Sequence, residues 1–186
     1  MYADIRTIEE YTVDAAFMPS LGTSVYGFAS FEKLKSDQDG RSFSGRAKLS
    51  ESSDPRRNWF AKHRDEVDSF GIGVKHSLIK DKLDVGADYV YAKSTGSVDV
   101  TTGSALSSAT LPDLETKLHS LKVYADYKIK RDLVLRLRYW YEKYDSEDWA
   151  LDSVEPNTLA NVITLGESSA DYDVHAVGLS VLYRFD

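Results

Sequence analysis

The feature that most constrains this chain is a strict alternation of apolar and polar residues near its end. From Val177 to Phe185 every second residue is large and apolar, and the residues between them are mostly small or polar. A period of two residues is typical of a β-strand with one apolar side. The fold therefore depends on whether that side contacts a protein core or lipid.

The same alternation recurs along the chain in pairs of segments that tight turns connect. A turn at Lys80-Asp81 would pair Phe70 with Tyr91, and a turn at residues 130–132 would set Asp126 opposite Arg136 as an ion pair. The face of residues 24–33 stays ambiguous, because residues 25, 27, 29 and 31 compete with residues 26, 28 and 30 for the apolar side. The pattern predicts seven strands, near residues 10–18, 23–35, 67–79, 82–93, 116–129, 133–144 and 173–185.

Long polar connections alternate with the tight turns. They cover residues 36–66, 94–115 and 145–172, and loops of that length are uncommon in a compact soluble domain. Short turns at one end and long loops at the other are typical of outer-membrane barrels. The mean hydropathy of −0.39 does not exclude this class, because alternation and not bulk hydropathy is its signal.

Aromatic residues on the apolar side are sorted by position along the strands. One group lies toward the long loops and the other toward the tight turns, with aliphatic residues between them, as in the aromatic girdles of a membrane barrel. We therefore predict an all-β, antiparallel, up-and-down transmembrane β-barrel as a single region, 1–186. The predicted lipid-interface aromatics are Phe17, Tyr89, Tyr91, Tyr127, Tyr139, Tyr141, Tyr183 and Phe185.

Seven is an odd number of strands, whereas bacterial single-chain barrels have an even number. We expect either that the chain is the C-terminal part of a larger barrel, or that residues 36–66 contain a further strand. The first residues have neither the basic nor the apolar region of a signal peptide, so an outer-membrane location implies a missing N-terminal part.

Three segments carry a resemblance to a known family. They are LP-x-L-x-T-x-L-x-S-L from Leu111 to Leu121, Y-E-x-Y-x-x-x-D-W-A from Tyr141 to Ala150, and the L-x-V-x-Y-R-F strand that ends at Phe185. With them the chain resembles the C-terminal region of the MtrB/PioB family of decahaem-associated outer-membrane proteins.

The resemblance implies a porin-like sheath in the outer membrane of a Gram-negative bacterium. A periplasmic multihaem c-type cytochrome would lie in its lumen, carry electrons across the membrane and meet an extracellular multihaem cytochrome. The chain itself would hold no cofactor, which agrees with its lack of cysteine. The alternatives are a passive diffusion porin or small barrel without a cytochrome, and a soluble β-barrel that binds a ligand inside.

Charged residues on the polar side are the candidates for contact with a partner in the lumen. The alternative is that they pair among themselves and only solvate the wall, as charges on a wet surface usually do. If the apolar side faces lipid, arginine at Val85 or Leu135 should cost about 2–4 kcal/mol of stability, and arginine at Gly86 much less. The candidates are Lys75, Asp84, Asp88, Lys122, Asp126, Lys128, Arg136, Arg138, Glu142 and Arg184.

Catalysis, metal binding and nucleic-acid binding are not expected. No nucleophile elbow, phosphate loop or paired histidine motif is present, His63 is expected in a loop, and the net charge is −7. The acidic segment around Asp148 and Trp149 lacks calcium-loop spacing, so we assign these two residues to an outer loop that faces an extracellular partner.

Overall fold

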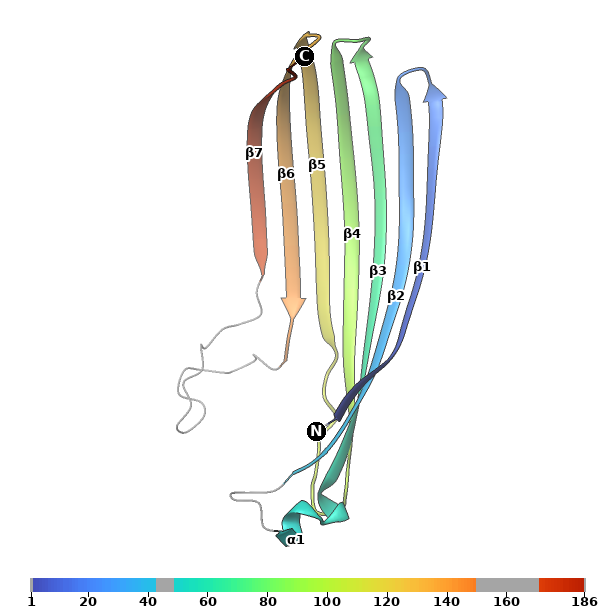
Figure 1. Cartoon of the computed structure of the whole chain (residues 1–186), viewed down its shortest axis with the longest axis vertical. Coiled ribbons are helices and arrows are strands. Elements are labelled where there is room, and N and C mark those ends of the chain that lie inside the picture. Colours follow the sequence, from blue (N-terminus) through green and yellow to red (C-terminus); the bar gives the residue numbers. More distant parts are fainter. Residues whose placement is uncertain (1, 43–48, 150–170, 186) are drawn as a thin grey trace.

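The computed structural model describes residues 2–42, 49–149 and 171–185, and it shows one antiparallel sheet in the order β1 to β7 (Figure 1). Every strand pairs with its neighbours in sequence, which is the up-and-down order that the alternation predicts. The strands are β1 (Tyr2–Ser20), β2 (Thr23–Arg41), β3 (Asn58–Ile79), β4 (Leu83–Thr102), β5 (Leu114–Lys130), β6 (Leu133–Glu147) and β7 (Tyr172–Tyr183).

In the part of the chain that the structure describes, helical structure is confined to the connection between β2 and β3. It consists of α1 (Leu49–Ser52) and the 3-10 turn η1 (Pro55–Arg57). Asp54 caps η1, because its carboxylate accepts hydrogen bonds from the side chain and the backbone N–H of Arg56, and these bonds lower the pKa of Asp54. None of the described helices is long or apolar enough to cross a membrane.

The sheet is a single layer without a core of its own. Among the described residues, Ala61 is the only buried apolar side chain. Val177 exposes 74% and Leu179 exposes 69% of its surface. A soluble domain of this length buries most of its large apolar side chains, so the apolar side of this sheet has to be covered from outside it.

The two outer edges of the sheet are unpaired within the described residues. β1 and β7 stand at opposite ends of the strand order, and the sheet is not closed (Figure 1). Exposed strand edges are not tolerated in the hydrocarbon of a membrane.

The register decides which residues share a side. Phe70 pairs with Tyr91, as predicted. The ambiguous segment in β2 is settled, because Tyr26 pairs with Gly73, which in turn pairs with Asp88 on the polar side. Phe31 therefore lies on the apolar side, where its ring meets Phe70 edge to face with centroids 5.7 Å apart.

The predicted two-residue turn between β3 and β4 is wrong. Three residues, 80–82, form the turn, and Leu83 pairs with Ile79 while Leu78 bulges out of the ladder. Asp81 has a φ of 61°, a left-handed conformation that aspartate tolerates better than most residues. The bulge keeps Phe70 and Tyr91 in register although the turn is one residue longer.

The strands also extend well into the predicted loops, which is a second correction. Residues 36–41 and 58–66 of the predicted loop 36–66 belong to β2 and β3, residues 94–102 belong to β4, and His63 lies in β3 and not in a loop. The apolar alternation fades there, because both sides of these strand ends carry mostly polar or small residues.

Ion pairs cover the outward side of these extensions. Lys33 Nζ lies 2.8 Å from Glu66 Oε1, and Arg64 Nη1 lies 3.8 Å from Asp99 Oδ2. A membrane strand needs about 9–11 residues, whereas β3 has 22. Strands β2, β3 and β4 therefore continue past the apolar band, at the end opposite the tight turns (Figure 1).

Candidate functional site

The polar side of the sheet brings the predicted lumen-facing residues together. Apart from Arg184, which follows β7, all of them lie in β3 to β6. Asp84, Asp126 and Arg136 form one cross-strand row, and Lys128 reaches Asp84 at 3.2 Å. Directly opposed residues in an antiparallel pair share a side, so these groups face one space.

The predicted ion pair between Asp126 and Arg136 is confirmed. The guanidinium donates from Nε to Oδ1 and from Nη2 to Oδ2, both at 2.6 Å. This parallel pair of charge-assisted bonds fixes both side chains across β5 and β6.

Aromatic rings lie over glycines on this side. Tyr124 covers Gly86, Tyr26 covers Gly73, and a Cβ added to either glycine would overlap the ring. Tyr26 also donates a hydrogen bond to Asp88. A side chain at Gly86 would meet the ring of Tyr124, so the lower cost expected for arginine at this position requires the ring to move and stays a prediction.

An open pocket of about 670 Å³ lies on the polar side between β3 and β7. Lys122 stands over the ring of Trp140 with Nζ 5.1 Å from the ring centroid. Tyr124 and Trp140 line this pocket, and neither is among the candidates that the sequence analysis names. The signal that could have found them is a large aromatic residue at a polar-side position, beside glycine or lysine on the next strand.

The apolar side carries a repeated tyrosine–histidine cluster. Tyr89 and Tyr139 each share a hydrogen bond of 2.8 Å with Nδ1 of His119 and His175, respectively. The ring of a second tyrosine lies against each histidine at a tilt, with centroids 4.9 Å apart for Tyr91 and His119 and 4.8 Å apart for Tyr141 and His175. The sequence signal for this repeat is Y-x-Y followed by a single histidine in the next strand.

The other predicted interface aromatics lie near the tight turns. Phe17 exposes 68% and Phe185 exposes 85% of its surface, and the rings of Tyr183 and Phe185 meet edge to face at 4.7 Å. Lys82 stands over Tyr127 at 5.6 Å. Contact of all these aromatic residues with lipid stays a prediction.

The two outer-loop candidates lie at the end of β6, and His76 hydrogen-bonds to a neighbouring strand. Asp148 and Trp149 directly follow β6, and residues 150–170 of their predicted loop lie outside the described part of the chain. His76 Nδ1 lies 2.8 Å from the hydroxyl of Thr23. In the described ranges no group of three or more histidine or acidic residues is arranged to hold a metal ion.

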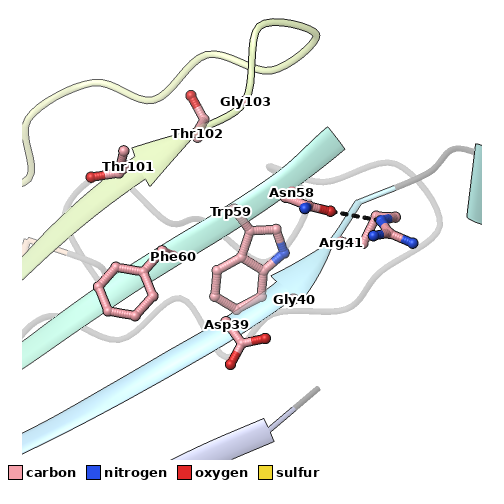
Figure 2. Close-up of a pocket in the computed structure, with 9 residues that line it drawn as sticks. All are labelled: Asp39, Gly40, Arg41, Asn58, Trp59, Phe60, Thr101, Thr102 and Gly103. Atoms are coloured by element: carbon pink, nitrogen blue, oxygen red, sulfur yellow. Dashed lines mark hydrogen bonds between the residues drawn. The ribbon is translucent and has the colours of Figure 1, made fainter. Parts of the chain in front are cut away.

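A second pocket, of about 570 Å³, lies where the extensions of β2, β3 and β4 end (Figure 2). The indole of Trp59 covers Gly40, and Arg41 Nε donates to Asn58 Oδ1 at 2.7 Å. Phe60 lies beside Trp59 at the pocket wall (Figure 2).

Comparison with known proteins assigns this two-sided sheet to a family. A family model described as an outer membrane beta-barrel porin, MtrB/PioB, matches residues 7–185. The chain belongs to the MtrB/PioB family. Outer membrane protein MtrB of Shewanella baltica (strain OS185) is 32% identical to it over 127 residues, which cover 68% of this chain.

Family membership establishes the all-β, porin-like fold and the outer-membrane location. The family is one of barrel proteins and not of enzymes. The matched segment covers only 18% of the length of the Shewanella protein.

Proposed function

We propose that this chain forms part of the wall of an outer-membrane barrel that holds a multihaem c-type cytochrome in its lumen for electron transfer across the membrane. The observation that carries the proposal is the sheet itself, because it has no core, an apolar outer side and a charged, hollowed inner side. Its membership of the MtrB/PioB family, to which the decahaem-associated proteins belong, supports a cytochrome as the guest.

A larger barrel follows from the energetics of the sheet edges. Within the described residues, β1 and β7 each have one edge without a partner strand, and each unsatisfied backbone group in lipid costs several kcal/mol. The limited share of the Shewanella protein that matches, 18%, leaves room for further strands. We infer that such strands pair with both edges and close the wall.

The wall would hold the cytochrome in position and separate its haems from lipid. The haems themselves would belong to the cytochrome. The chain has no cysteine, so it cannot attach haem through thioether bonds itself. Its polar side would hold the cytochrome through ion pairs and hydrogen bonds, and its apolar side would separate the haems from lipid. The strand extensions, with Asp148 and Trp149 at the end of β6, would face an extracellular cytochrome.

Purification of the tagged full-length protein from its host in detergent tests the proposal. We expect a multihaem cytochrome to co-purify, visible by haem staining after gel electrophoresis, and to survive washing at moderate salt. A passive porin would instead show steady ion conductance in planar bilayers and no haem band. A protein that stays monomeric and soluble without detergent would contradict both functions.

A further inference from the structure

We propose that the pocket between β3 and β7 binds a carboxylate of the partner, with Arg138 as its main contact and Lys122 and Lys75 beside it. The identity of the partner rests on the proposed function. The chemical class of the ligand is a carboxylate, which a haem propionate or an acidic side chain of the cytochrome would supply equally.

The charge of the pocket is opposite to that of the chain. The chain carries a formal net charge of −7, yet the pocket is lined by four basic side chains and only two carboxylates. A pocket with more cations than anions attracts and orients an anionic group.

Both carboxylates are already occupied. Asp126 is held by two bonds from Arg136, and Asp88 accepts the hydroxyl of Tyr26. Three cations of the lining are left without a hydrogen bond or an ion pair to any residue in the described ranges. They are Lys75, Lys122 and Arg138.

The surroundings of Arg138 leave space for a ligand. Across the strands Arg138 is paired with Tyr124 on one side and Gly178 on the other, and a Cβ built on Gly178 meets nothing within 4 Å. A guanidinium with an open side can hold a carboxylate by two parallel hydrogen bonds. Trp140, which exposes 44% of its surface, offers an apolar face next to it.

The test uses the full-length protein in detergent and the variants Arg138→Gln and Lys122→Gln. The matched control is Arg131→Gln, which removes a cation in the turn between β5 and β6, outside the pocket. The first readout is the affinity for the co-purified cytochrome. The second readout is the binding of two probes, iron protoporphyrin IX and a hexaglutamate peptide. The dimethyl ester of the porphyrin, which has no free propionate, is the control for the first probe.

We expect each pocket variant to weaken cytochrome binding by about tenfold, because a bond to a charged group is lost, while the control stays near wild type. Selective loss of porphyrin binding that needs free propionates identifies propionate as the source, and selective loss of hexaglutamate binding identifies acidic side chains. If the wild-type protein binds no cytochrome, the proposed function fails. Binding of the probes then decides by itself whether the pocket is a carboxylate site. Equal cytochrome and probe binding by Arg138→Gln and wild type overturns the carboxylate site.

Discussion

Two leucines in β7 allow a direct test of the sides of the sheet, because the same substitution can be made on each. Leu179 lies on the apolar side, where Leu137 pairs with it, and Leu182 lies three residues further on the polar side. Leu179 is four residues from Tyr183 and four from His175. At about 3.4 Å per residue and a tilt near 40°, it stands roughly 10 Å from either aromatic girdle, close to the middle of the lipid band.

Arginine at the middle of a bilayer costs about 2–4 kcal/mol in a membrane barrel, whereas a residue facing a wet lumen keeps its hydration. We therefore expect Leu179→Arg to lower the free energy of unfolding by about 2–4 kcal/mol and Leu182→Arg by less than about 1 kcal/mol. The assay is reversible unfolding of the full-length protein in urea with lipid vesicles. Equal losses for the two variants, or a larger loss for Leu182→Arg, would refute the assignment of the sides.

The other predictions concern packing on the polar side. Gly86→Ala should displace the ring of Tyr124 and cost about 1–3 kcal/mol in the same unfolding assay, whereas Gly178→Ala, with open space around it, should stay within about 0.5 kcal/mol of wild type. A double-mutant cycle with Asp126→Ala and Arg136→Ala should give a coupling near 1 kcal/mol, because the pair is half-buried and doubly bonded. A coupling of zero would mean that the bonds contribute nothing measurable.

Much of the fold could be predicted, because alternation is a local signal. Where one side of a strand is apolar, as around Val177, a shift by one residue would move the whole apolar side into the lumen, so the register is strongly specified. The pairing of Phe70 with Tyr91 and of Asp126 with Arg136 follows from this and is observed.

The strand ends could not be predicted, because their stability does not come from an apolar side. Residues around Lys33 and Glu66 are held by ladder hydrogen bonds and cross-strand ion pairs, which leave no periodic hydrophobic signal. The sequence pattern does not predict the three-residue turn at Asp81, because the bulge beside it restores the register that a shorter turn would give.

The pocket could be predicted only in part. Alternation assigns Arg138 and Lys122 to the polar side. Whether these two cations have an ion-pair partner depends on which side chains already bind the nearby carboxylates Asp126 and Asp88. The ring of Tyr124 over Gly86 joins two strands whose register has to be known first. Such contacts follow from the pairing of strands and not from the pattern within one strand.

The most direct test of the lipid-facing side is a labelling scan through β7. The chain has no cysteine, so single cysteines from residue 177 to residue 182 can carry a spin label in the full-length protein in lipid, with any cysteine elsewhere replaced. We predict that labels at residues 177, 179 and 181 collide with dissolved oxygen, and that labels at 178, 180 and 182 collide with a water-soluble nickel chelate. Uniform accessibility along the strand, or the reverse alternation, would contradict the account.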